Sequence, residues 1–435
     1  MSAAPVEAVP AASPARTAGH VWYVVFLLTV VNVVNYMDRM ALAVLAPAIK
    51  RDLTLSDAQL GLLVGLAFSL FYAVCGVPIA RWADRGVRRN IIALALAVWS
   101  AMTALSGAAQ NFWHLFLARL GVGAGEAGCL PPAWSILCDY VPLKRRPTIF
   151  AIHGFGLYAG IMVGMVLAGW LGQTIGWRWA FVLIGLPGVA LAVVVWLTLR
   201  EPERGALDGG ASAETPPLGK TLAALWKCPT YRALIAMYVL NGFVQYGLHQ
   251  WWPSFYARVF DLSLASVGAY LGMAVGAGSG IGILLGGFIA SKVVERDIRR
   301  PLIIGAIATG LAMPAALGTL FSPSQSVSMA CVWLTSILWG VSNGPVAAAL
   351  NSVVAPRMRA TASSLTVVFA AVLGFGFGPF CVGLLSDMLA PSLGAQSLRY
   401  ALLAPVCTIP LMVVALCAIA KRLPADLAAV GVRPQ

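Results

Sequence analysis

Long apolar stretches alternate with short polar segments along the whole chain. A helix needs about 20 mostly apolar residues to cross the ~30 Å hydrocarbon core of a bilayer. The pattern predicts twelve such helices, at residues 22–47, 58–80, 91–109, 112–138, 148–172, 177–199, 230–257, 265–290, 301–321, 327–351, 361–386 and 398–420. Their length and their glycine content favour helices over the shorter alternating strands of a membrane barrel.

The composition supports the same class of protein. Of 435 residues, 60% are hydrophobic and 10% are charged, and the mean hydropathy is +0.85. Soluble domains contain about 25% charged residues, so the sequence predicts an all-α membrane protein. The eight cysteines include no C-x-x-C pair, and we interpret them as small apolar residues rather than disulfides or ligands. We predict neither a metal site nor a cofactor.

The distribution of basic residues predicts the orientation in the membrane. With both termini in the cytoplasm, 22 of the 29 Lys and Arg residues lie in cytoplasmic segments and 5 in external ones. This asymmetry follows the positive-inside rule, and it explains the net charge of +13 without a nucleic-acid partner. We therefore expect a multi-pass plasma-membrane protein, for which a bacterial inner membrane fits best.

A polar segment at residues 200–229 divides the chain into two halves of six spans each. A shift of 214 residues superposes two prolines and one arginine near the ends of spans four and ten. Parallel six-span repeats are typical of transporters that bind substrate near the bilayer midplane. We predict a disordered cytoplasmic tail at 1–20, a six-helix bundle at 21–199, a cytoplasmic linker at 200–229, a second six-helix bundle at 230–420 and a cytoplasmic tail at 421–435.

Four charged residues interrupt the apolar spans. Asp38 and Arg39 lie in the first span, and Arg119 and Glu126 lie in the fourth. A charge in hydrocarbon costs ~2.5–3.5 kcal/mol on insertion scales, so such residues are usually functional. Burial raises the proton affinity of an acid and a nearby cation lowers it. We therefore predict that Asp38 and Glu126 couple transport to protons; the alternative is a permanent ion-pair lock.

Two polar stripes complete the predicted site. Asn32, Asn35, Tyr36 and Arg39 follow the i, i+3, i+4, i+7 spacing of one helix face, and a second stripe lies in span seven. The alternative is a seam of interhelical hydrogen bonds. The predicted substrate-binding residues are Arg39, Arg119, Asn32, Asn35, Tyr36, Asn241, Gln245, His249 and Asn343.

The loop after span two resembles a signature of the major facilitator superfamily. That signature has the form G-x-x-x-D-R-x-G-R-R. Asp84, Arg85, Arg88 and Arg89 match it, whereas Ala80 and Val87 replace its two glycines. The resemblance implies two bundles that alternate access to a central site. We predict that a cytoplasmic gate forms from Asp84, Arg85, Arg88, Arg145 and Arg146.

A narrower resemblance points to the spinster branch of this superfamily. It is carried mainly by Asn35-Tyr36-Met37-Asp38-Arg39 and by the segment Gly121–Ala127. The resemblance implies transport of an amphipathic lipid-like anion, such as a lysophospholipid or sphingosine-1-phosphate. An organic-anion symporter, which also has an N-Y-x-D-R first span, remains the alternative, with small sugar acids as substrates.

Other classes of membrane protein have less support. A channel would need a ring of filter residues or a short oligomeric subunit. The sequence contains no H-E-x-x-H or G-x-x-x-x-G-K-[ST] motif, so we do not expect an enzyme or an ATP-driven pump. We predict a monomeric transporter whose partners are its substrate, protons and the lipid bilayer.

Overall fold

The computed structural model describes residues 18–205, 218–354 and 358–429. Parts of the two predicted tails and of the predicted linker at 200–229 therefore lie outside the described residues. Within the described ranges every regular element is a helix, which confirms the predicted all-α class. Ten helical segments in these ranges are long and apolar enough to cross a membrane.

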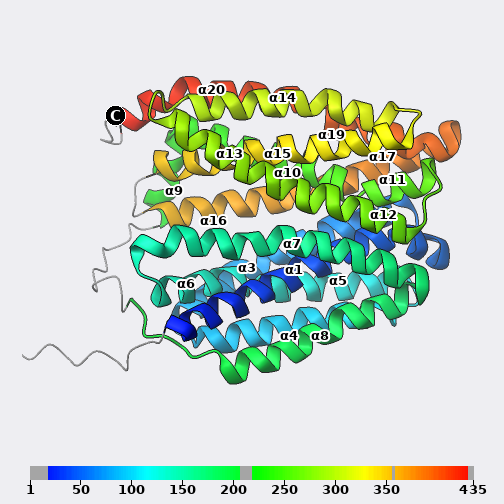
Figure 1. Ribbon diagram of the computed structural model, residues 1–435, viewed down its shortest axis with the longest axis horizontal. Coiled ribbons are helices and arrows are strands. Elements are labelled where there is room, and N and C mark those ends of the chain that lie inside the picture. Colours follow the sequence, from blue (N-terminus) through cyan, green and yellow to red (C-terminus); the bar gives the residue numbers. More distant parts are fainter. Residues whose placement is uncertain (1–17, 206–217, 355–357, 430–435) are drawn as a thin grey trace, which may run out of the picture.

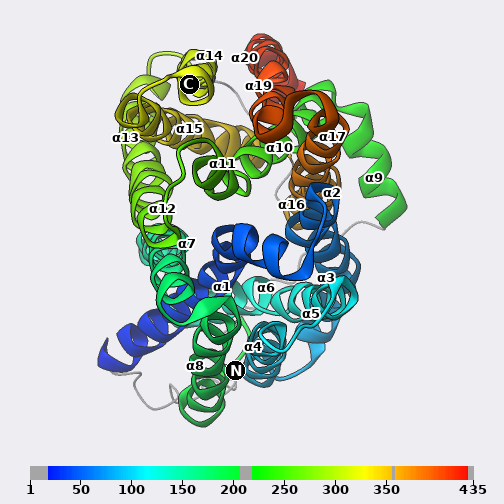
Figure 2. The same ribbon diagram turned by 90° about the vertical axis from the view of Figure 1, so that its right-hand side faces the viewer.

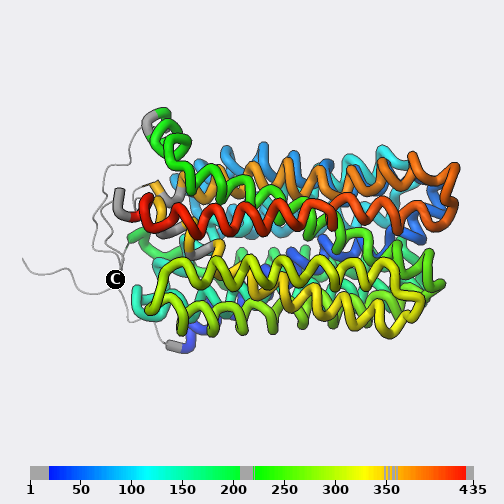
Figure 3. Tube along the Cα trace, turned by 90° about the horizontal axis from the view of Figure 1, so that it is seen from above, coloured from blue at the N-terminus to red at the C-terminus, as the bar shows by residue number. Residues whose placement is uncertain are grey.

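The helices run side by side along the long axis of the molecule (Figure 1). The start of α1 (Ala18–Leu53) and the end of α20 (Ile409–Ala429) lie at the same end, which we call the terminal end. We call the opposite end the distal end. Figure 2 looks along the helices from the distal end, and Figure 3 shows the same arrangement from above.

The helices form two groups that follow the order of the chain (Figure 2). Besides α1, the first half contains α2 (Asp57–Gly61), η1 (Leu62–Leu66), α3 (Ala67–Arg85), α4 (Arg88–Ser106), α5 (Phe112–Glu126), α6 (Leu130–Tyr140), η2 (Leu143–Arg145), α7 (Arg146–Thr174) and α8 (Gly176–Thr198). Besides α20, the second half contains α9 (Leu218–Lys227), α10 (Pro229–His249), α11 (Trp252–Val259), α12 (Leu264–Leu271), η3 (Gly272–Ala277), α13 (Gly278–Val294), α14 (Arg300–Phe321), α15 (Gln325–Val353), α16 (Arg359–Phe369), η5 (Ala370–Gly376), α17 (Phe377–Leu393), η6 (Gly394–Gln396), α18 (Ser397–Ala401) and α19 (Leu403–Cys407).

Two predicted spans are each divided into two helices. The stretch at 112–138 forms α5 and α6, and the stretch at 230–257 forms α10 and α11. Prolines occupy the first turn of both α6 and α11. Proline lacks the N–H that a continuous helix would need, but it fits the first turn of a new helix. The breaks therefore follow from Pro131, Pro132 and Pro253.

Within the described residues, three short π-helical segments lie where the two halves meet. These are η1, η3 and η5; η1 packs against η5, and η3 packs against α7. At Gly65 in η1, an added Cβ would collide with the carbonyl oxygen of Gly376 in η5. Glycine therefore permits this close approach of the two backbones. Such π segments occur frequently at functional sites.

Candidate functional site

A buried ion pair joins α1 to α5 within the first half. Arg39 donates a hydrogen bond from Nε to Glu126 Oε2 at 2.5 Å, and the two side chains are 8% and 0% exposed. Both are predicted site residues, and the structure brings them together. Removing one partner of such a pair costs about 3–5 kcal/mol, because the other charge is left buried and uncompensated.

Aromatic rings surround the Arg39 guanidinium. Its Cζ lies 4.9, 4.6 and 5.3 Å from the ring centroids of Tyr36, Phe68 and Tyr72. Contacts of this kind stabilise a cation where water is scarce. Phe68 and Tyr72 are not predicted from the sequence, because an aromatic residue in an apolar span looks the same whether it packs or binds.

Asp38 and Arg119 are also buried near this pair, and neither forms an ion pair among the described residues. Thr103 Oγ1 on α4 donates a hydrogen bond to Asp38 Oδ2 at 3.3 Å, and Asp38 Oδ1 has no partner among the described residues. Arg119 Cζ lies 5.4 Å from the Phe68 ring. Because consecutive helix residues point about 100° apart, Asp38 faces α4 while Arg39 faces α5. The four predicted charges thus form one close pair with two further buried charges.

The predicted polar residues of span one are all on α1 but face different surroundings. Asn32 donates from Nδ2 to the carbonyl oxygen of His153 on α7 at 2.9 Å. Asn35 is 1% exposed. Tyr36 lies beside Arg39 and also lines a pocket with Asn32. Asn32 and Tyr36 therefore reach the same pocket, and Tyr36 also adjoins the ion pair.

The predicted polar residues of the second half are partly buried. Asn241 Oδ1 accepts a hydrogen bond from Trp339 Nε1 at 2.6 Å, which fixes α10 against α15. Next to Gln245, Tyr246 stacks on Phe375 with ring centroids 4.4 Å apart. Among the described residues, no hydrogen bond or ion pair joins His249 or Asn343 to the Arg39–Glu126 pair. Asn241 therefore fits the alternative of an interhelical hydrogen bond.

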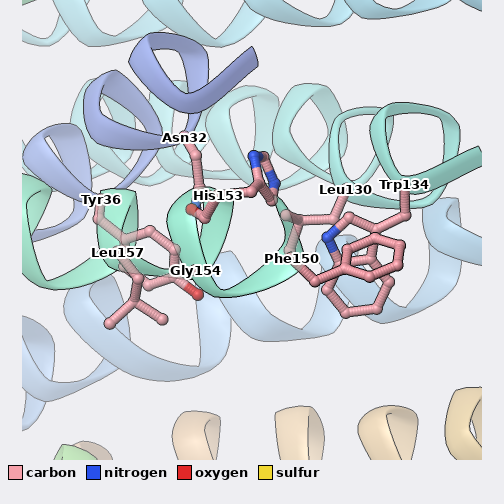
Figure 4. Close-up of a pocket in the computed structure, with 8 residues that line it drawn as sticks. All are labelled: Asn32, Tyr36, Leu130, Trp134, Phe150, His153, Gly154 and Leu157. Atoms are coloured by element: carbon pink, nitrogen blue, oxygen red, sulfur yellow. The ribbon is translucent and has the colours of Figure 1, made fainter. Parts of the chain in front are cut away.

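A pocket of about 300 Å³ lies between α1, α6 and α7 (Figure 4). Its lining residues are Asn32, Tyr36, Leu130, Trp134, Phe150, His153, Gly154 and Leu157. Six of these eight have apolar or aromatic side chains or none. The described residues contain no cluster of three His, Cys, Asp or Glu side chains that could hold a metal ion.

A network of charges joins the two halves at the distal end. Asp57, at the start of α2, accepts hydrogen bonds from both terminal nitrogens of Arg258 on α11, at 2.6 and 2.5 Å. Lys50 at the end of α1 also pairs with Asp57, and Ser386 on α17 donates to it at 2.7 Å. The Asp57 side chain is 3% exposed. This interface therefore satisfies a buried carboxylate with groups from both halves.

A second carboxylate strengthens the same interface through the backbone. The carboxylate of Asp387 on α17 accepts hydrogen bonds from the backbone N–H groups of Asp57 and Ala58, at 2.9 and 2.7 Å. An anion is stabilised at a helix N-terminus by free N–H groups and by the helix dipole. Sequence reasoning misses Arg258 and Asp387. The only signal is a charged residue near a span end, and that alone does not name a partner.

The predicted gate residues at the terminal end do not form one cluster in this conformation. Arg88 is 1% exposed and pairs with Asp139 at 2.5 Å and with Glu201 at 2.7 Å, all within the first half and its linker. Asp84 and Arg85 are exposed, and no ion pair of Asp84 is found among the described residues. Arg145 is also exposed.

Arg146, the last predicted gate residue, donates from Nε to the carbonyl oxygen of Val141 at 3.1 Å. The gate with Asp84 stays a prediction, and it would concern a conformation in which the terminal end is closed.

Replacing Asp84 by Asn is expected to favour the conformation seen here. The side chain is exposed in this state, so the substitution should leave its stability within about 0.5 kcal/mol of the parent while weakening the closed alternative. A cysteine at Gly154, where an added Cβ meets nothing within 4 Å, should then react faster with a soluble thiol reagent. The eight native cysteines are removed first, and Arg81→Gln, at an exposed residue outside the predicted gate, serves as the control. Unchanged labelling at position 154 would contradict the gate.

These features define a polytopic membrane transporter: two groups of helices, buried charges inside apolar spans, and a pocket beside those charges. Comparisons with known proteins agree. The family model described as Major Facilitator Superfamily matches residues 28–379, and the chain therefore belongs to this superfamily.

Three relatives are similar over most of the chain. The MFS-type efflux pump of Mycolicibacterium smegmatis is 35% identical over 398 residues, which is 90% of each chain. Human protein spinster homolog 1 is 28% identical over 87% of this chain and 74% of its own. The probable L-galactonate transporter of Escherichia coli is 26% identical over 83% of this chain and 82% of its own.

A solved structure from the spinster group has the same fold as this chain. A bacterial homolog of the human lysosomal transporter Spinster, in an inward-facing and unoccupied conformation, superposes with a TM-score of 0.83 and 29% identity. The superposition covers 94% of this chain and 99% of that one. These likenesses confirm the predicted spinster branch and a transporter rather than an enzyme.

Proposed function

We propose that this protein is a proton-coupled secondary active transporter that carries an amphipathic lipid-like anion by alternating access. The observation that carries the proposal is the buried Arg39–Glu126 pair, which lies next to a largely apolar pocket. Tyr36 contacts the Arg39 guanidinium and also lines this pocket. A fixed cation with an apolar pocket beside it suits a substrate with one charged end and one apolar end. The spinster relatives support the lipid-like class.

Proton coupling would use Asp38 and Glu126. Both carboxylates are buried, and each has one side-chain oxygen without a partner among the described residues. Glu126 is held by Arg39, so protonation of Glu126 would release the guanidinium, and an anionic substrate could then occupy the freed position. Asp38 forms no ion pair among the described residues and accepts a hydrogen bond from the Thr103 hydroxyl, so its charge is compensated less than that of Glu126. Competition between a proton and an ion pair is a physical basis for coupling.

The terminal end would face the cytoplasm, as the positive-inside rule predicts. Closure of the distal end by the Asp57 network and the likeness to an inward-facing structure support an inward-open state. The kinship with an efflux pump supports export. In this proposal the N-terminal bundle (21–199) and C-terminal bundle (230–420) rock about the interface formed by η1, η3, η5 and α7.

Measurements of substrate binding and of substrate exchange test the proposal. The purified protein in proteoliposomes should show saturable binding of a lysophospholipid and accelerated exchange of labelled for unlabelled substrate. A channel would not accelerate exchange, because it does not alternate between two exposed states. Saturable binding of a small sugar acid, with none for any lysophospholipid, would overturn the substrate class.

A symporter of small organic anions such as sugar acids is the second candidate. The likeness to a probable L-galactonate transporter favours it. A polyhydroxylated acid would use hydrogen-bonding groups from both halves, and Gln245, His249 and Asn343 are partly buried polar residues of the second half. The binding comparison above separates the two candidates.

Replacing Arg39 by Lys is expected to weaken substrate binding about tenfold, equivalent to ~1.4 kcal/mol. Lysine keeps the charge, but it loses the planar guanidinium that bonds Glu126 and stacks among Tyr36, Phe68 and Tyr72. Arg119→Lys should also bind more weakly. The measurement is the dissociation constant at fixed pH. Normal affinity in both lysine variants would show that only positive charge is needed there.

A further inference from the structure

Two buried polar side chains in the pocket have hydrogen-bonding atoms without a partner among the described residues. His153 is 2% exposed, and neither of its ring nitrogens has a hydrogen-bond partner among the described residues. Asn32 is 3% exposed; its Nδ2 is bonded to the His153 carbonyl oxygen, and its Oδ1 is free. A buried polar group without a partner costs about 1–3 kcal/mol. These groups are therefore suited to receive hydrogen bonds from a guest molecule.

Apart from the Tyr36 hydroxyl, the rest of the pocket is apolar, and it carries no charge. Trp134 and Phe150 meet edge to face with ring centroids 6.1 Å apart, and Leu130 and Leu157 add aliphatic surface. The lining contains no Asp, Glu, Lys or Arg. Figure 4 shows the two aromatic rings at one end, Tyr36 and Leu157 at the other, and His153 with Asn32 between them. The part of a ligand held here must therefore be uncharged, with one hydrogen-bonding group on an apolar body.

The pocket also borders the buried ion pair and the interface between the halves. Tyr36 lines the pocket, and its ring lies 4.9 Å from the Arg39 guanidinium. On α7, the pocket residues lie between the face packed on α1, at Gly156 and Gly160, and the face packed on η3, at Met162. A ligand with its charge at Arg39 would therefore place its neighbouring atoms in this pocket.

We propose that the pocket is a subsite for the uncharged, hydrogen-bonding junction of an amphiphile, with His153 and Asn32 as its specificity-determining residues. This inference rests on the proposed function and deepens it. The charged headgroup lies at Arg39, the hydroxyl or ester group next to the chain bonds to His153 and Asn32, and the start of the chain packs on Trp134 and Phe150. The site then selects acylated glycerol phosphates over plain alkyl phosphates.

The test compares two amphiphiles that differ only in this junction. A monoacylglycerol phosphate has a hydroxyl and an ester beside its chain, whereas hexadecyl phosphate has neither. The wild-type protein should bind the first about tenfold more tightly, the effect of roughly one well-placed hydrogen bond. His153→Leu should lower affinity for the monoacylglycerol phosphate about tenfold and leave hexadecyl phosphate unchanged. His153 makes no side-chain bond within the described protein, so this variant should fold.

Controls separate specificity from packing. His114→Leu changes an exposed histidine at the start of α5, outside the pocket, and should alter neither affinity. Equal weakening of both amphiphiles by His153→Leu would indicate a packing role and overturn the subsite, as would an unchanged preference. If wild-type protein binds neither amphiphile, the proposed function fails as well. If the His153 variant does not fold, Asn32→Leu must show the same selective loss, and an unselective loss there would overturn the subsite.

Discussion

Replacing Asp38 by Asn is expected to abolish transport driven by a pH gradient. One pH unit supplies about 1.4 kcal/mol per coupled proton, which sustains roughly tenfold accumulation, and a carboxamide cannot carry that proton. Asn is nearly the same shape and can still accept the Thr103 hydrogen bond. Because Asp38 has no ion-pair partner among the described residues, the variant should fold as well as the parent.

The measurement is accumulation in proteoliposomes with and without an imposed pH gradient, together with exchange at equal pH. Asp38→Asn should keep exchange and lose the response to the gradient. Glu126→Gln should lose the same response, but it leaves Arg39 unpaired and should also lower thermal stability. Thr103→Val is the matched control, because it removes the hydrogen bond while keeping the carboxylate. A full response to the gradient in both acid variants would exclude this coupling.

Replacing Asp57 by Asn is expected to open the distal end. The substitution leaves Arg258 and Lys50 without their counter-charge. Because these two cations are partly exposed, at 21% and 31%, the cost is about 2 kcal/mol. This energy corresponds to roughly a thirtyfold shift toward the state with the distal end open. Spin labels on Thr54 and Asp261, which are exposed in the two halves, should then report a longer distance.

A control of similar chemistry lies within one half. Asp52 on α1 pairs with Arg178 on α8, and both belong to the first half. Asp52→Asn therefore removes an ion pair at the same end of the molecule without touching the interface between halves. Its label distances should match those of the parent. If Asp57→Asn leaves the distance distribution unchanged, the network does not hold the distal end closed.

The spans and the buried charges were accessible to sequence reasoning for one physical reason. A bilayer requires long apolar segments and makes charges inside them costly, so residues such as Arg39 and Glu126 are conspicuous. The breaks before α6 and α11 were missed as boundaries because proline in a membrane helix can also be accommodated as a kink. Local sequence does not decide between the two outcomes.

The interaction partner of each buried charge is much harder to predict from the sequence. The pair of Arg39 with Glu126 follows from the fold, and Asp38 turns away from Arg39 only because neighbouring helix residues diverge. Arg258 and Asp387 meet Asp57 from 201 and 330 residues further along the chain. The aromatic residues around Arg39 are equally hidden, since Phe68 has the same apolar character as any packing residue. Such contacts depend on how the helices pack against one another. The spacing of residues in a single sequence does not reveal that packing.

The contact of Asp387 with the start of α2 has a consequence for sequence change. Its carboxylate binds peptide N–H groups of Asp57 and Ala58, which every residue except proline presents. The side chain of Ala58 is therefore free to vary without loss of this bond, whereas position 387 needs a carboxylate. Selection acts unequally on the two sides of the contact, so covariation between aligned positions would not reveal it.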